Sequence, residues 1–134
     1  MNRDGNPYVY RWHIINNPIV SVYFHIQVSD DGERMHDHPG DNTSIILAGG
    51  YREYTCNRVG DRYVPVHPID REPEEVIHRL AETPHRLTLL GKYSMSLFVM
   101  GPKRRDWGFW MDDDFLVLSY LQLCFLRQTL VVIQ

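Results

Sequence analysis

The chain has 134 residues, a length that suits one domain with a single core. Its net charge of −3 excludes the strongly basic surface that is typical of nucleic-acid-binding domains. Its two cysteines, Cys56 and Cys124, lie too far apart in sequence to match a metal or redox spacing. Since residues 1–11 contain no secretory signal, we expect a protein of the reducing cytoplasm that binds neither nucleic acid nor membrane.

Short apolar segments with a period of two, separated by turn residues, dominate the chain. The clearest is 19–29, where apolar and polar side chains alternate as they do on opposite faces of a strand. Its polar face carries Ser21, Tyr23, His25 and Gln27. We predict further strands near 34–38, 43–48, 51–56, 61–65, 76–80, 84–90, 94–100 and 106–110. This spacing predicts an all-β sandwich or a closed barrel.

Two segments are open to a second interpretation. Residues 74–78 could form a short helical turn instead of a strand, because Pro73 is compatible with the first position of a helix. Residues 115–133 are apolar over a length that resembles a membrane span, but polar residues and Arg127 interrupt them, so we expect a buried or partner-covered element. The acidic run 112–114 favours a helix over 115–126, whereas the β-branched residues of 130–133 favour a strand.

Two histidines one residue apart are the strongest chemical signal in the sequence. On a strand, His36 and His38 point to the same face and can reach one metal ion. A tight site needs a third ligand, and His85 is the best candidate because it follows a proline-marked turn and begins a predicted strand. Strand parity indicates further side chains that could line the same cavity. The candidates for catalysis are Tyr51, His25 and His78, and those for substrate binding are Arg86 and Ser96.

At these residues the sequence resembles the cupin superfamily. The run 36–38 followed by Gly49 and Gly50 is similar to the first cupin motif, and Pro84 with His85 is similar to the core of the second. The run His-Asp-His-Pro at 36–39, Ile-Leu-x-Gly-Gly-Tyr at 46–51 and Gly-Pro-x-x-Arg-x-Trp-Gly-Phe at 101–109 resemble small uncharacterised bacterial and phage cupins. The resemblance implies a jelly-roll barrel over 1–110. The apolar segment 111–134 would then pack on the barrel or in an oligomer interface, as in a homodimer.

The ligand set departs from the usual cupin pattern. Asn42 or Thr43 stands where most cupins have a glutamate ligand, and Asp41 is the nearest carboxylate. Three arrangements are open: three histidines with water, Asp41 as a fourth ligand, or Asp41 orienting a ligating imidazole. The asparagine that often follows the second-motif histidine is also missing.

The resemblance implies one divalent transition metal and a small-molecule substrate. Histidine ligands do not distinguish Fe(II), Zn, Ni and Mn from one another. With iron the expected chemistry is that of a dioxygenase, and with the other metals that of an isomerase, lyase or hydrolase. Two alternatives are a non-catalytic cupin that binds a small ligand and a metal-free enzyme resembling sugar-nucleotide epimerases. The latter would use His36 or His38 with Asp41 as base and a tyrosine as acid.

Overall fold

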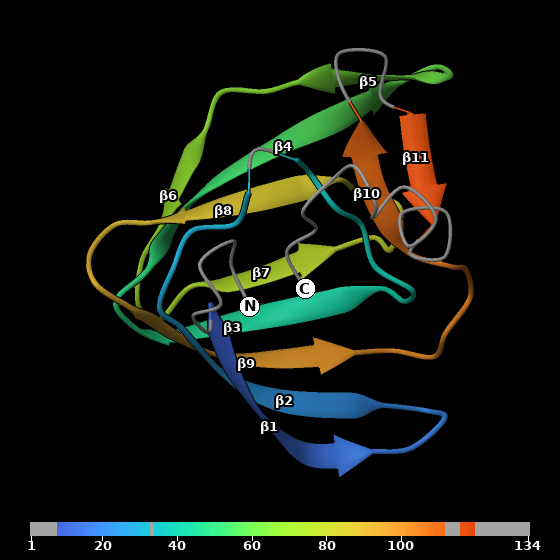
Figure 1. Cartoon of the computed structure of the whole chain (residues 1–134). Helices are drawn as coiled ribbons and strands as arrows, with labels where there is room; N and C mark the ends of the chain where they lie inside the picture. The colour runs from blue at the N-terminus through green and yellow to red at the C-terminus, as the bar shows by residue number, and fades with distance from the viewer. Residues whose placement is uncertain (1–7, 33, 112–115, 120–134) are drawn as a thin grey trace, which may run out of the picture.

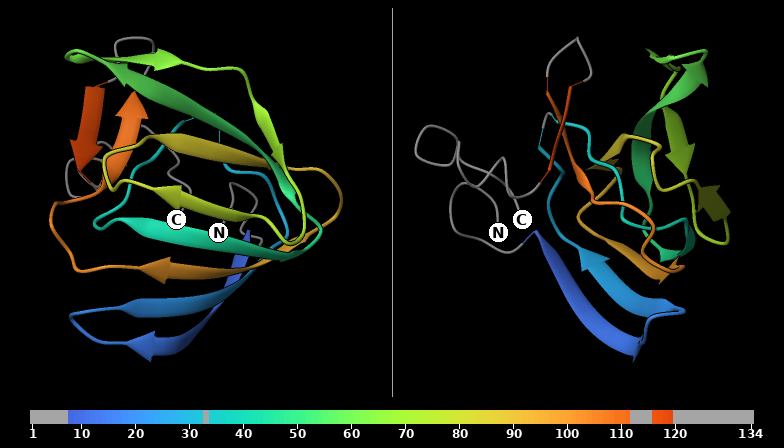
Figure 2. Two further views of the ribbon diagram at one scale, coloured as in Figure 1. Left: turned by 180° about the vertical axis from the view of Figure 1, so that it is seen from behind. Right: turned by 90° about the vertical axis from the view of Figure 1, so that its right-hand side faces the viewer.

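The computed structural model describes residues 8–32, 34–111 and 116–119, and within these ranges every regular element is a β-strand (Figure 1). Two antiparallel sheets face each other and curl into a barrel (Figure 2). The first sheet has the order β1 (Val9–Asn16), β2 (Ser21–Gln27), β9 (Ser94–Met100), β3 (Asn42–Ala48) and β7 (Val76–Arg79). In the second, β4 (Tyr51–Val59) pairs with β5 (Arg62–Pro65), β6 (Ile69–Arg71) and β8 (His85–Leu89). The predicted all-β barrel is confirmed.

A separate two-stranded ribbon consists of β10 (Gly108–Met111) and β11 (Leu116–Ser119). Over Leu116–Ser119 the expected helix is therefore wrong, because this segment pairs as a strand with β10. Residues 120–134 lie outside the described ranges, and β10 runs across the domain boundary that we placed at residue 110. Within the described ranges no helix has the length and apolarity needed to cross a membrane.

The five-stranded sheet turns its more polar face to the barrel interior. Arg11, His25, Ser96 and Ile46 are cross-strand partners in one row and therefore share a face. Ile46 is 1% exposed and packs with Tyr51 of the opposite sheet, so this row faces inward. The neighbouring row consists of Trp12, Phe24, Leu97 and Ile45 and faces away from the interior. Because Trp12 is 51% exposed, the apolar face of β1 and β2 is the outer one in this chain.

The buried apolar core is small. It consists of Ile46, Tyr51 and Ile77, with Leu87 packed against them. Many of the remaining buried side chains are polar or charged, and several of them bond to one another, as Glu53 does with Arg79 and His85. Such groups are tolerated inside a protein only when they are paired.

The turn between β3 and β4 requires glycine. Gly49 and Gly50 have φ of 79° and 111°, and β-carbons there would collide with the backbone oxygens of Tyr93 and Arg71 respectively. Only a residue without a β-carbon combines this backbone conformation with so close an approach. The glycine pair thus brings β4 back over the first sheet.

Some local predictions were wrong or incomplete. The segment 74–78 is not a helical turn, since Glu74 has φ of 79° and β7 begins at Val76. Residues 34–38 form only isolated bridges, in which His36 pairs with His85 and Phe109. The strands β1 and β6 were not predicted, because neither shows a long apolar alternation bounded by strong turn signals.

Candidate metal centre

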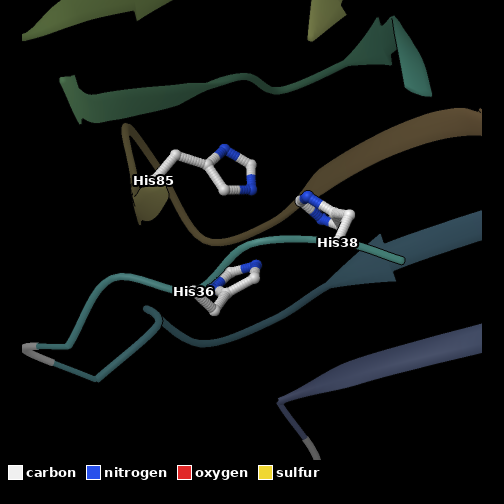
Figure 3. A group of neighbouring side chains, drawn as sticks. All are labelled: His36, His38 and His85. Atoms are coloured by element: carbon white, nitrogen blue, oxygen red, sulfur yellow. The ribbon is translucent and has the colours of Figure 1, made fainter. Parts of the chain in front are cut away.

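The structure brings His36, His38 and His85 together inside the barrel (Figure 3). One potential ligand atom from each of the three imidazoles lies within 4.8 Å of the other two. The two chain segments are joined directly, because the backbone N–H groups of His36 and His85 each donate to the other's carbonyl oxygen at 2.9 Å. This antiparallel bridge places both side chains on the same side, with ring centroids 4.7 Å apart.

Asp37 anchors the segment that carries the first two histidines. Its side chain points the opposite way from theirs and is fully buried. Its Oδ1 accepts a hydrogen bond from the Gly108 N–H at 2.7 Å, and its Oδ2 accepts one from Trp110 Nε1 at 3.2 Å. The Arg105 guanidinium lies 2.8 Å from the same Oδ2. Asp37 therefore holds the segment in place where a continuous strand ladder is missing.

The imidazoles present buried nitrogens that lack a protein partner. His85 Nε2 and His38 Nδ1 are both inaccessible to solvent and make no hydrogen bond. Burial lowers the pKa of His85 to about 3, with a further contribution from the charge of Arg79. Burial likewise lowers the pKa of His38 well below its ordinary value. Both imidazoles are thus neutral near pH 7, the form that binds metal, and a metal would satisfy nitrogens that are otherwise costly to bury.

Glu53 fixes the orientation of His85. Its Oε2 lies 2.6 Å from His85 Nδ1, so Nδ1–H donates to the carboxylate and the lone pair remains on Nε2. Arg79 Nε donates to the same oxygen at 2.6 Å, and an Arg71 nitrogen lies 3.0 Å from Oε1. Burial raises the pKa of Glu53, but the hydrogen bond from His85 and the charge of Arg79 outweigh it, so the net pKa is lowered and the group is ionised. A carboxylate behind a ligating histidine stabilises its orientation and raises its basicity.

A second carboxylate lies beside His36. Asp31 Oδ2 is 4.0 Å from His36 Nδ1, too far for a hydrogen bond but near enough for electrostatic attraction. The same oxygen accepts a hydrogen bond from the Leu87 N–H at 2.8 Å. Burial raises the pKa of Asp31, while His36 acts in the opposite direction. The loop between β2 and His36 is thereby tied to β8.

Asp41 lies outside this group of side chains. Its Oδ1 accepts hydrogen bonds from the Ala81 N–H at 2.8 Å and from Arg104 Nη2 at 2.7 Å. It lines a different pocket, of about 370 Å³, together with Thr43, His78 and Val99. None of its contacts reaches an imidazole of the histidine group, so the structure does not bring it there as a ligand or as a partner of a ligand.

The candidate catalytic residues occupy different places. His25 belongs to the inward row of β2, with its ring stacked on Phe98 at 5.5 Å. The Tyr51 hydroxyl is buried and accepts a hydrogen bond from Arg79 Nη2 at 3.0 Å. His78 follows the inward-facing Ile77 on β7, so it points to the outer face, where its Nδ1 lies 2.7 Å from Thr43 Oγ1.

The two candidate substrate-binding residues also separate. Ser96 lies in the inward row between His25 and Ile46. Arg86 follows the inward-facing His85, and its guanidinium lies over the ring of Tyr54, 3.8 Å from the centroid. Glu53 and Asp31 were not predicted from the sequence. Strand parity could have indicated Glu53, because it is two residues from Tyr51 and shares its face.

Comparison with solved structures identifies the fold as that of the cupins. A cupin superfamily protein from Desulfitobacterium hafniense DCB-2 is 17% identical, with a TM-score of 0.57 over 77% of this chain and 84% of that one. The DMSP lyase DddQ from Ruegeria pomeroyi DSS-3 is 14% identical, with a TM-score of 0.57 over 91% of this chain and 56% of that one. Hydroxypropylphosphonic acid epoxidase (HppE) from S. wedmorenis is 11% identical, with a TM-score of 0.55 over 75% of this chain and 57% of that one. No protein-family model and no curated protein sequence matches the chain.

Proposed function

We propose that the chain is a metal-dependent cupin enzyme that acts on a small molecule and holds its metal through His36, His38 and His85. The observation that carries this proposal is the convergence of three imidazoles, two of which have a buried nitrogen without a partner. Three neutral ligands are the minimum that protein metal sites with an open position use. Two solved structures with the same fold carry the names of a lyase and an epoxidase, and the epoxidase HppE has been solved with Fe(II) and with Co(II).

The residues around the centre would divide the work. A divalent ion held by three uncharged ligands supplies Lewis acidity and open coordination positions, and with iron it supports oxygenation. Glu53 would keep the proton of His85 on Nδ1 and so leave Nε2 for the ion. Asp31 would offset positive charge near His36, and the packed surroundings of His85 would keep water from that side. The choice among Fe(II), Zn, Ni and Mn depends on measurement, because imidazole suits each of them.

A non-catalytic cupin that binds a small ligand is the second candidate. The observation in its favour is that two of the three proposed acid–base residues are committed elsewhere. The Tyr51 hydroxyl is bonded to Arg79, and His78 lies on the outer face. His25 lies on the inner face, where the Phe98 ring contacts both it and His38. We also propose, as separate points, a homodimer, a cytoplasmic location, and packing of 111–134 on the barrel or in the dimer interface.

Metal analysis of protein purified without chelators tests the proposal. We expect close to one transition-metal ion per chain in the parent and a loss of more than 90% in His38→Ala, because removing one of three ligands leaves too few for tight binding. His78→Ala is the matched control, since it removes a histidine from the outer face of the same barrel. The parent should also melt at a higher temperature with metal than without it. Absence of metal from the parent, with no change in Tm on adding Fe(II), Zn, Ni or Mn, refutes the site.

A further inference from the structure

A row of polar side chains leads from the edge of the barrel to the histidine centre. Arg11 on β1 pairs across the strands with His25 on β2, and His25 pairs with Ser96 on β9. The row faces the interior, because it continues to the buried Ile46. Arg11 itself is exposed, so its side chain borders both the interior and solvent.

Arg11 is a cation without an acidic partner. Its Nε donates a hydrogen bond to His25 Nε2 at 2.9 Å, and its guanidinium carbon lies 5.1 Å from the centroid of the Tyr23 ring. Within the described ranges no carboxylate lies within ion-pair distance of it, whereas Arg79 and Arg104 both contact carboxylates. Its two terminal nitrogens are therefore left to bind a ligand. Two parallel N–H groups of a guanidinium match the two oxygens of a carboxylate.

The rings of His25 and Phe98 connect this cation with the histidine centre. The Phe98 ring lies 5.5 Å from the His25 ring and 5.4 Å from the His38 ring, measured between centroids. A small molecule lying over Phe98 would contact the Arg11 side at one end and the histidine centre at the other.

His25 fixes the orientation of the Arg11 guanidinium by accepting its Nε–H. Because Arg11 donates to Nε2, the proton of the neutral imidazole resides on Nδ1. Burial, followed by the charge of Arg11, lowers the pKa of His25 to about 4, so the ring is neutral near pH 7. The negative charge of Glu53 is directed to Arg79 and Arg71 and does not compensate Arg11. Arg11 therefore keeps its positive charge and its terminal N–H donors for an anion.

We propose that Arg11, with its guanidinium oriented by His25, binds the carboxylate of a small organic anion whose other end reaches the metal held by His36, His38 and His85. The inference rests on the proposed function, because the metal supplies the second point of attachment. The substrate class is then a short molecule with a carboxylate at one end and an oxygen donor at the other. Arg11 would favour ligands with a negative charge, and the reaction would take place at the end of the ligand that binds the metal.

Binding of succinate to the Co(II)-loaded protein tests this. Succinate carries two carboxylates, one for each point of attachment. Its monoamide succinamate has nearly the same shape, and when its carboxylate binds the ion only an amide is left for Arg11. Visible absorption of Co(II) reports metal loading and binding at the ion, and the change in Tm reports binding without reference to metal. We expect the parent to bind succinate about 10- to 100-fold more tightly than succinamate, as is typical of a charge-assisted hydrogen-bonded pair. Arg11→Gln should reduce this preference to about threefold or less while leaving Co(II) loading unchanged.

The control is Arg52→Gln, which removes an exposed arginine whose partner is Asp70 on the neighbouring strand. It should bind succinate as the parent does. If Co(II) binds and Arg11→Gln keeps the full preference, the anion site is refuted and the metal proposal stands. If Co(II) does not bind but succinate raises the Tm of the parent and not of Arg11→Gln, an anion site exists at Arg11, but its attachment to a metal is refuted together with the proposed function. If neither ligand binds, both proposals are refuted.

Discussion

Substitution of Glu53 by glutamine removes one charge from the most buried polar group behind the centre. Glu53 is 2% exposed and contacts His85, Arg79 and Arg71. Glutamine has nearly the same volume, but it supplies one neutral acceptor oxygen in place of the two charged oxygens of the carboxylate. Arg79 would then remain buried without a charged partner, and its other contacts are with the Tyr51 and Ser44 hydroxyls.

Removal of one member of a buried ion pair costs about 3–5 kcal/mol, because the other charge stays uncompensated. We therefore expect Glu53→Gln to lower the free energy of unfolding of the metal-free protein by about 3 kcal/mol or more. Loss of a carboxylate behind a ligating histidine should also weaken metal affinity about 10- to 100-fold. Urea unfolding in a chelator measures the first effect, and competition with a metal-binding dye measures the second.

Asp70→Asn provides the matched control. It breaks the pair of Asp70 with Arg52, which has a short separation of 2.7 Å but side chains that are 44% and 47% exposed. Exposed pairs contribute about 0–1 kcal/mol, so this variant should unfold almost as the parent does and keep its metal affinity. Equal losses of stability in the two variants, or unaltered metal affinity in Glu53→Gln, would refute the assignment of Glu53 as the group that orients His85.

Three further outcomes follow from the same structure. In metal-free protein the free energy of unfolding should fall as pH drops below about 6.5, because the unfolded chain then binds protons that the folded chain does not. In the folded chain the pKa of His85 is lowered to about 3, so this imidazole stays neutral. The slope should be up to about 1.4 kcal/mol per pH unit for each buried histidine. Denaturant titrations across pH measure this, and a rise in stability toward acid contradicts it. Asp37→Asn should cost about 1.5–3 kcal/mol by calorimetry, since it weakens a charged hydrogen bond to the Gly108 N–H and the pair with Arg105, and an unchanged Tm would argue against this anchor. Gly49→Ala should lower the free energy of unfolding, measured in urea, by at least about 3 kcal/mol, because its β-carbon would collide with the backbone. Gly60→Ala should lower it by only about 1 kcal/mol, since Gly60 has φ of 65° but open space around it. Similar losses in the two variants would refute the collision.

The sequence was sufficient to predict the all-β barrel, most strands and the three histidines that converge. Alternation along 19–29 identified two faces of a strand, and the spacing of His36 and His38 put their side chains together. These features are local, since each depends on the period of two of an extended chain. His85 was predicted as the third ligand from its position after a proline-marked turn, and the cupin resemblance supported its pairing with these residues.

Other features depended on contacts between distant segments. Alternation does not reveal which face of β2 points inward, and in this barrel the polar face does, contrary to the general tendency to bury apolar groups. Asp41 was close to the histidines in sequence, yet Arg104 and the Ala81 N–H hold it elsewhere. Glu53 could have been identified by its parity with Tyr51, but its role depends on Arg79, which approaches from the other sheet.

The inward-facing polar row has a consequence for how such a protein can change over generations. Side chains such as Tyr23, His25 and Ser96 are only half-buried and lie outside the small apolar core. Substitutions at such positions usually alter stability less than substitutions in a packed core do. The interior can therefore exchange one set of recognition groups for another by single mutations, while the glycine turn, the Glu53 cluster and the packed residues preserve the scaffold. Adaptation to a new ligand is in this way separated from the requirement to fold.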